Sequence, residues 1–306
     1  MDLVGEPVDI DKVIVQEDFR YGDHELQRLT VYHHFGRDAV QDGRGLFIIY
    51  IHGGAWRDPS ITEKSFYPTI RALHSTTSQR EQMNKHVTGI ASISYRLSAH
   101  PDHPQDPTIP ATERRDAQHP EHLQDVVASI SFLQAKYGFG SRYLLVGHSC
   151  GATLAFQSLV RGSMFMPLTQ ALPFQNPEVV VGVAGIYDLR LLRDSHSHPA
   201  YQEFIVGAFG DDEKAWDSAS PANFHLMDVW PEARTVVLAS SSKDGLVDNG
   251  QIDCMGSKLA TLNKTARVLV LRDFLDLPHD DIWEKGVGLA RVVAETLKVW
   301  EAGDSG

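Results

Sequence analysis

A five-residue motif near the middle of the chain limits its possible folds more than any other feature. Gly147-His148-Ser149-Cys150-Gly151 lies between a short apolar run, residues 142–146, and a run typical of a helix, residues 152–156. A turn that leads so sharply from strand to helix has no space for side chains at its ends, which explains the two glycines. The serine is held in a strained backbone conformation that raises its hydroxyl above the sheet. The motif therefore predicts a nucleophilic serine on a strand–turn–helix unit.

Segments typical of strands and helices alternate along the chain. The strand-like runs are residues 12–20, 26–33, 46–51, 86–95, 142–146, 179–185, 234–239 and 267–271, and the first two are interpreted as an entry hairpin. The helical runs are 122–136, 249–262 and 287–300, and Gly303 to Gly306 are expected to end the last one. This alternation predicts a mostly parallel central sheet with helices on both faces. Together with the serine motif it is typical of the α/β-hydrolase fold.

Two segments interrupt the alternation. Residues 98–120 are rich in Pro and His and are expected to be irregular, whereas residues 188–231 carry helical patches without strand signals. We interpret the second segment as a small lid or cap inserted after a strand. At 306 residues, of which 42% are hydrophobic, the chain can form one large core. Residues 1–306 are therefore predicted to be a single α/β-hydrolase domain with a lid at about 188–231.

The net charge and the two cysteines limit which partners the protein is expected to bind and in which cellular compartment it is expected to occur. The chain carries 28 Lys and Arg against 40 Asp and Glu, a net charge of -12, whereas nucleic acids and anionic membranes attract basic surfaces. The first ten residues lack the features of a signal peptide, and no run approaches the about 20 apolar residues of a membrane span. A disulfide through Cys150 would lock the serine motif, so Cys150 and Cys254 are expected to be reduced thiols. We therefore expect a cytoplasmic protein that binds neither nucleic acid nor membrane.

A serine hydroxyl becomes a good nucleophile only when a base takes its proton and a third group orients that base. In this fold the partners follow the serine in the order acid, then histidine, each on a loop after a strand. The run 234–239 is followed by a loop that contains Asp244, and the run 267–271 by a loop that contains His279. The sequence therefore predicts a catalytic triad of Ser149, Asp244 and His279.

Other residues compete for these roles. Asp248 lies in the same loop as Asp244, but it is expected to be the N-cap of the helix at 249–262. Asp280 and Asp281 adjoin the predicted base, and neighbouring residues seldom point at the same imidazole. His148 precedes the serine, and its side chain is expected to point away from the hydroxyl. None of the four displaces the predicted triad.

The tetrahedral intermediate of acyl transfer needs hydrogen-bond donors for its oxyanion. One is expected to be the backbone N–H of Cys150, directly after the nucleophile. The second is expected from the loop after the strand at 46–51, which reads His52-Gly53-Gly54-Ala55-Trp56. Its glycines allow backbone N–H groups to approach the acyl carbon without an intervening side chain.

Metal and cofactor chemistry have weaker support. Spaced histidine pairs occur at His100 and His103, at His119 and His122, and at His196 and His198. None of these pairs forms a His-Glu-x-x-His or cysteine-paired site, and the sequence has no glycine-rich phosphate loop. We therefore interpret the pairs as structural or incidental and expect no metal and no cofactor.

Several segments resemble one enzyme family. They are His52-Gly53-Gly54-Ala55-Trp56-Arg57-Asp58-Pro59, Ser94-Tyr95-Arg96-Leu97, the serine motif, Gly185-Ile186-Tyr187-Asp188-Leu189 and Ser220-Pro221. These residues are similar to those of fungal kynurenine formamidases and, more broadly, of hormone-sensitive-lipase-like esterases. The broader group usually has His-Gly-Gly-Gly in the oxyanion loop, whereas this chain has the His-Gly-Gly-x-Trp pattern of the formamidases.

The resemblance implies hydrolysis of N-formyl-L-kynurenine to L-kynurenine and formate, in tryptophan breakdown toward NAD, by enzymes that are commonly homodimers. It assigns the triad to Ser149, Asp244 and His279 and the oxyanion motif to residues 52–56. We further expect Trp56 to wall a tight acyl site. Arg57 or the region of Tyr67 is a candidate contact for the substrate carboxylate, and the alternative for Arg57 is a solvated surface charge. A carboxylesterase of short acyl esters and a non-catalytic binding protein of the same fold are the alternatives.

Overall fold

The computed structural model describes residues 14–33, 45–160, 174–226, 230, 234–260 and 266–304. Their centre is an eight-stranded sheet in the order β1-β2-β4-β3-β5-β6-β7-β8. The strands are β1 (Val15–Arg20), β2 (Arg28–His33), β3 (Leu46–Ile51), β4 (Val87–Ile93), β5 (Tyr143–His148), β6 (Val179–Val183), β7 (Thr235–Ser241) and β8 (Arg267–Leu275). β2 is antiparallel to both β1 and β4, and β4, β3, β5, β6, β7 and β8 are parallel to one another. The predicted mostly parallel sheet and entry hairpin are confirmed; residues 12 and 13 of the hairpin lie outside the described part.

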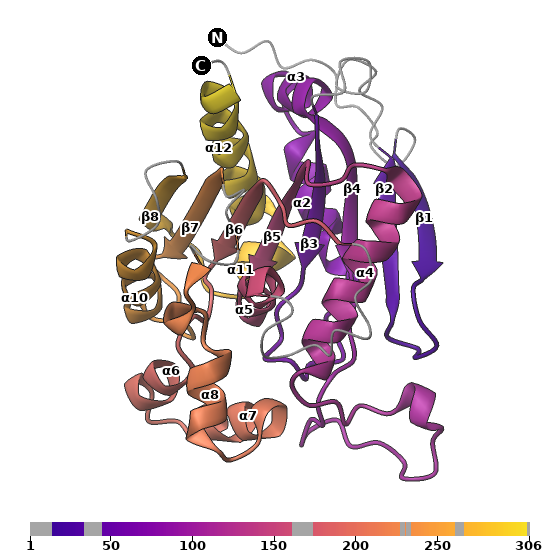
Figure 1. Cartoon of the computed structure of the whole chain (residues 1–306), viewed down its shortest axis with the longest axis vertical. Helices are drawn as coiled ribbons and strands as arrows, with labels where there is room; N and C mark the ends of the chain where they lie inside the picture. Colours follow the sequence, from indigo (N-terminus) through magenta and orange to yellow (C-terminus); the bar gives the residue numbers. More distant parts are fainter. Residues whose placement is uncertain are drawn as a thin grey trace.

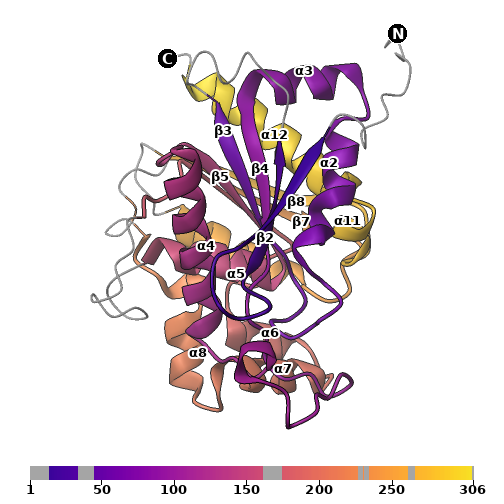
Figure 2. The same ribbon diagram turned by 90° about the vertical axis from the view of Figure 1, so that its right-hand side faces the viewer.

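Helices cover both faces of this sheet (Figure 2). One face carries α4 (Glu121–Tyr137), α5 (Cys150–Gln157) and α10 (Asn249–Leu259), and the other carries α2 (Tyr67–Leu73), α3 (Thr77–His86) and α12 (Val287–Asp304). The short elements are η2 (Glu63–Phe66), η3 (Ala111–Glu113), η4 (Ser158–Val160), η6 (Pro221–Asn223) and α11 (Asp281–Glu284). Alternate residues of the central strand β3 enter the two cores, so all six are buried. This explains why the strand is a continuous apolar run.

Three short helices lie beyond the carboxyl ends of the parallel strands. They are α6 (Leu189–Ser195), α7 (Ala200–Phe209) and α8 (Glu213–Ala219), between β6 and β7. Figure 1 shows them below the sheet, at the opposite end of the molecule from the C-terminus. They occupy the segment predicted to carry helical patches; residues 227–229 and 231 of that segment lie outside the described part.

The predicted helices are confirmed, with differences at their ends. The apolar stripe predicted for α4 is buried, and Asp248 is the N-cap of α10, accepting a hydrogen bond from the Gly250 N–H. Helix α12 continues through Gly303 and Asp304, beyond the expected end at Trp300. Residues 261, 262, 305 and 306, which belong to the predicted ends of two helices, lie outside the described part. Arg267 of β8 donates to the carbonyls of Val299 and Ala302, which satisfies the final turn. No described helix is both long and apolar enough to span a membrane.

The serine motif has the predicted strand–turn–helix geometry. Ser149 joins β5 to α5 at φ 55 and ψ -124, a left-handed conformation that costs a serine free energy. A Cβ on Gly147 would lie 2.3 Å from the Gly151 carbonyl oxygen, and a Cβ on Gly151 would lie 2.3 Å from the Ile51 carbonyl oxygen. The Ser149 N–H donates to the Val183 carbonyl at 3.0 Å, which ties the turn to β6.

This close backbone approach predicts the effect of one added methyl group. Gly151→Ala forces β3 and α5 apart and is expected to lower the free energy of unfolding by about 2–3 kcal/mol, measured by urea denaturation. Gly207→Ala is the matched control, because no heavy atom lies within 4 Å of its added Cβ and alanine favours the helix α7. Equal stability of the two variants would contradict the crowding at the turn.

Candidate active site

A cavity of about 630 Å³ opens next to the serine motif. At the sheet, the cavity is lined by Ser149, His148 and His279. Its walls are formed by the 54–58 loop, the α6–α7 segment and the 245–247 loop. Ile61, Ile186, Leu192, Phe204 and Val247 make much of the lining apolar. The size is that of sites for single small molecules. The structure therefore brings the predicted nucleophile and the predicted base to one small-molecule cavity.

His279 and Asp244 form the tightest polar contact at this site. His279 Nδ1 lies 2.7 Å from Asp244 Oδ2, with the carboxylate side chain 1% exposed and the imidazole 7% exposed. The other carboxylate oxygen accepts the N–H groups of Leu246 and Val247, both at 2.9 Å. A carboxylate held in this way keeps the proton of the imidazole on Nδ1 and leaves Nε2 as the basic nitrogen.

Ser241 positions the two loops relative to each other, a role that the sequence analysis missed. It is the last residue of β7, and its hydroxyl donates to the Leu277 carbonyl at 2.6 Å and accepts from the Leu277 N–H at 2.9 Å. The N–H of Ser242 donates to the Leu275 carbonyl at 2.9 Å. The loop that carries His279 is therefore fastened to the start of the loop that carries Asp244. A serine after a strand is too common to signal this role in sequence.

The 52–56 loop lies close to Ser149. A Cβ on Gly53 would lie 3.0 Å from the Ser149 Cβ, and Gly54 and Ala55 line the cavity. Gly54, Ala55 and Trp56 all have positive φ, at 96°, 48° and 60°. The turn this produces directs the Arg57 and Asp58 N–H groups to the Gly54 carbonyl. The Ala55 N–H is directed at the Cys150 sulfur, so Gly53 and Gly54 are the residues of this loop whose N–H groups are candidates to bind a ligand near Ser149.

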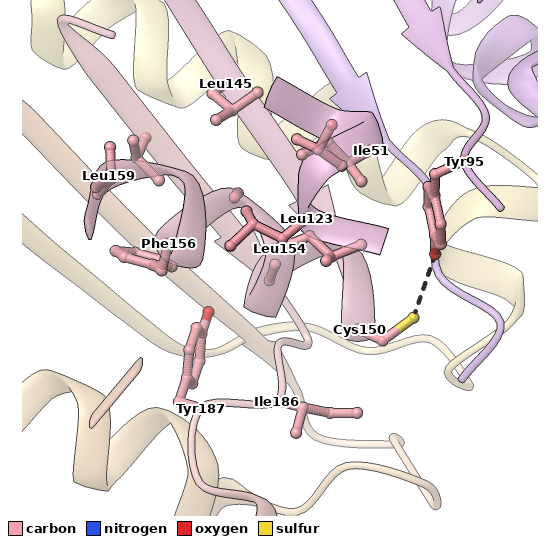
Figure 3. Packing of buried hydrophobic residues seen from close by; sticks show 14 of the residues in the cluster. Ile51, Tyr95, Leu123, Leu145, Cys150, Leu154, Phe156, Leu159, Ile186 and Tyr187 are labelled. Atoms are coloured by element: carbon pink, nitrogen blue, oxygen red, sulfur yellow. Dashed lines mark hydrogen bonds between the residues drawn. The ribbon is translucent and has the colours of Figure 1, made fainter. Parts of the chain in front are cut away.

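Buried groups behind the loop hold it in this conformation. The Trp56 N–H donates to the Cys150 sulfur at 3.3 Å, and the Tyr95 hydroxyl lies 3.6 Å from the same sulfur (Figure 3). Tyr95 also donates to the His52 carbonyl at 3.1 Å and stacks on the His52 ring at 4.5 Å. Burial raises the pKa of the Cys150 thiol to about 11 and lowers the pKa of His52 to about 4. Both groups are therefore neutral at pH 7.

Two expectations about side-chain placement need correction. Trp56 was expected to wall the acyl site, but its ring is fully buried and packs on Phe209 at 5.0 Å and on Phe204 at 6.2 Å. Of these rings only Phe204 is in the cavity lining, so the Trp56 indole lies behind the residues that line the cavity. His148 was expected to point away, but it lines the cavity and lies 4.6 Å from the His279 ring. Burial, together with the neighbouring His279, lowers the pKa of His148 well below its usual value.

The remaining candidates divide between the cavity and other places. Arg57 lines the cavity, whereas Tyr67 stacks on Tyr32 and is not part of the lining. Three histidines of the spaced pairs, His100, His196 and His198, line the cavity. Periodicity does not reveal this, because they lie in irregular segments that folding alone brings together. In the described residues no group of three or more His, Cys, Asp and Glu side chains is placed to hold a metal ion.

The chain is similar to several known proteins. The BD-FAE family matches residues 38–259. A kynurenine formamidase-like hydrolase of Fusarium equiseti is 40% identical, with 83% of each chain covered. A kynurenine formamidase of Aspergillus versicolor is 36% identical, with 79% of this chain and 85% of the relative covered.

Solved structures share the fold at low sequence identity. Esterase B of Lactobacillus rhamnosus matches with a TM-score of 0.65 and 16% identity over 100% of this chain and 88% of that one. A hormone-sensitive lipase from a metagenome library matches with a TM-score of 0.63 and 17% identity over 95% and 86%. The architecture is that of the α/β-hydrolases.

The Ser241 contacts predict that loss of one hydroxyl slows reaction at Ser149 without unfolding the protein. Ser241→Ala is expected to reduce the labelling rate of Ser149 by a fluorophosphonate by about 10-fold, because the histidine loop loses its anchor. Ser242→Ala is the control: its hydroxyl lies 3.4 Å from the Leu275 carbonyl, a weak contact, so about wild-type labelling is expected. Indistinguishable rates for the two variants would refute this role.

Buried histidines make stability depend on pH. Burial lowers the pKa of His52 and His119 to about 4 and that of His122 to about 3, whereas an unfolded histidine titrates near 6.5. Between these values the unfolded chain binds more protons, so stability falls as the pH drops from about 6.5 toward 4.

The expected loss between pH 7 and pH 5 is about 2 kcal/mol per histidine, measured by urea unfolding at both values. His122→Gln is expected to remove about that much of the pH dependence, whereas the exposed His103→Gln should leave it unchanged. An identical pH dependence in His122→Gln and the wild type would disprove this origin.

Proposed function

This chain belongs to the BD-FAE family, with fungal kynurenine formamidases among its relatives, and we propose that it hydrolyses N-formyl-L-kynurenine to L-kynurenine and formate. The observation that carries the proposal is the 2.7 Å contact between His279 and the buried Asp244, at the cavity that Ser149 also lines. We place the reaction in the cytoplasm, in tryptophan catabolism toward NAD. No cofactor takes part in the proposed chemistry.

The proposed reaction begins at the serine. Ser149 Oγ attacks the formyl carbon while Nε2 of His279 takes the hydroxyl proton, and Asp244 stabilises the resulting imidazolium. The oxyanion accepts hydrogen bonds from the N–H of Cys150 and from the N–H groups of Gly53 and Gly54. His279 then protonates the departing aryl amine, and water attacks the formyl-enzyme to release formate.

The shape of the site supports a small acyl group and an aromatic leaving group. Gly53 approaches Ser149 so closely that a Cβ would lie 3.0 Å from the serine Cβ, which leaves little room beside the carbonyl carbon. A formyl group carries only hydrogen there. The apolar lining, with Tyr201, Phe204 and Trp283, offers aromatic surfaces for the aryl ring. The wall around the formyl group is therefore assigned to the 53–55 backbone and not to Trp56.

The neutral groups around Ser149 favour the proposed proton transfers. His52 and His148 have lowered pKa values because they are buried, and the raised pKa of Cys150 keeps its thiol protonated. The buried carboxylate of Asp244, 2.7 Å from His279 Nδ1, is therefore assigned the role of stabilising the imidazolium in the transition state.

Kinetics on two substrates test the proposal against the esterase alternative. The kcat/KM for N-formyl-L-kynurenine is expected to exceed that for p-nitrophenyl acetate, and Ser149→Ala should abolish both activities. Higher turnover of the ester with negligible formamide hydrolysis would instead identify a carboxylesterase. No turnover of either substrate, with no phosphonate labelling of Ser149, would favour a non-catalytic binding protein.

The orienting carboxylate has its own test. Asp244→Asn is expected to lower kcat by about 10³- to 10⁴-fold with little change in KM, because the amide favours the wrong imidazole tautomer. Asp248→Asn is the matched control from the same loop, and it should remain within about 3-fold of wild type, since asparagine also caps helices. A greater loss in Asp248→Asn than in Asp244→Asn would reverse the assignment.

A further inference from the structure

A partly compensated cation lies in the wall of the cavity. The side chain of Arg57 is only 13% exposed, and its Nη1 lies 2.5 Å from Glu203 Oε1 on α7. Its guanidinium carbon lies 5.8 Å from the centre of the Phe204 ring, which also lines the cavity. A guanidinium that is withdrawn from water in this way requires a counter-charge.

The two partners of this ion pair differ in their freedom to move. Glu203 is 54% exposed, so its carboxylate can turn into solvent at little desolvation cost. Arg57 is enclosed by the cavity wall and follows directly on the oxyanion loop, with its own N–H bonded to the Gly54 carbonyl at 3.0 Å. A guanidinium also presents five donors in a planar fork, and Glu203 contacts it at Nη1. Another carboxylate can therefore replace Glu203 on Arg57.

His100 provides a neutral donor near this cation. Its Nδ1 accepts the Asp102 N–H at 3.1 Å, so Nε2 carries the proton of the neutral ring. His100 lines the same cavity, and burial followed by the charge of Arg57 lowers its pKa. The lining thus combines a fixed positive charge with a neutral N–H donor, which suits one carboxylate.

We propose that Arg57 and His100 form a subsite that binds the carboxylate of the substrate's amino-acid tail, in exchange for Glu203. This inference rests on the proposed function, since N-formyl-L-kynurenine carries a carboxylate at the far end of the tail from its formamide. With the formyl group at Ser149 and the ring on the apolar wall, the tail extends toward Arg57. The subsite selects formanilides that bear a carboxylate over those without a tail.

Three substrates separate this subsite from the chemistry at Ser149. They are N-formyl-L-kynurenine, its des-amino analogue 4-(2-formamidophenyl)-4-oxobutanoate, and the tail-free 2′-formamidoacetophenone. Arg57→Met is expected to lower kcat/KM for the two carboxylates by about 10- to 100-fold, mainly through KM. Turnover of the tail-free compound should stay within about 2-fold of wild type. Arg57→Lys keeps the charge without the fork and should give an intermediate loss.

Two further variants serve as controls. Arg193→Met removes an arginine that, like Arg57, pairs with a glutamate and lies over an aromatic ring, but outside the cavity lining, so no substrate-dependent effect is expected. Glu203→Gln removes the replaceable partner and is expected not to raise KM for N-formyl-L-kynurenine. A rise as large as that in Arg57→Met would show that the ion pair itself is required, and would overturn the proposal.

The outcomes distinguish failure of the proposed formamidase activity from failure of the proposed carboxylate subsite. If the wild type hydrolyses none of the three formamides, the proposed function fails and the subsite fails with it. If all three are hydrolysed and Arg57→Met reduces them equally, the formamidase activity stands and the carboxylate subsite is refuted. A loss confined to N-formyl-L-kynurenine, with the des-amino analogue unaffected, would also refute it.

Discussion

The approach of one backbone to another at the start of α5 is the constraint on which the rest of the site depends. Gly151 lies so close to the end of β3 that a Cβ there would be 2.3 Å from the Ile51 carbonyl oxygen. Ser149 and the loop of residues 52–56 are therefore held together by one close backbone contact. The bond from the Trp56 N–H to the Cys150 sulfur is a second contact between the two segments. A shift of either segment would move both the Ser149 hydroxyl and the backbone of residues 53–56.

A second constraint is electrostatic. The site is rich in ionisable groups, but burial keeps those beside Ser149 neutral: His52 and His148 have lowered pKa values and Cys150 a raised one. Asp244, whose oxygens accept three hydrogen bonds, lies against the imidazole of His279. A carboxylate fixed in this way needs little reorganisation when charge develops on a neighbouring imidazole.

Much of the fold could be predicted from the sequence, because β3 is a continuous apolar run and α4 carries an apolar stripe, and burial explains both patterns. Helix α3 was missed because its sequence is polar, and its visible signal is the Thr76 cap. The pairing of Asp244 with His279 could be predicted from the order of the strands and from the loops that follow them. Ser241, His148 and the buried face of Trp56 could not be found in this way, because their roles depend on loop conformations with positive φ and on contacts between distant segments. Local sequence patterns predict many of the helices and strands, but they do not predict how side chains are oriented in the loops that connect them.

The thiol next to Ser149 has a consequence for the protein's sensitivity to its surroundings. Burial raises the pKa of Cys150 to about 11, so the thiol stays protonated at pH 7. Alkylating agents, peroxides and nitrosating species attack the thiolate form, and the buried sulfur also excludes them sterically. The sulfur therefore serves as a hydrogen-bond acceptor for the Trp56 N–H and does not compete with the Ser149 hydroxyl one residue away.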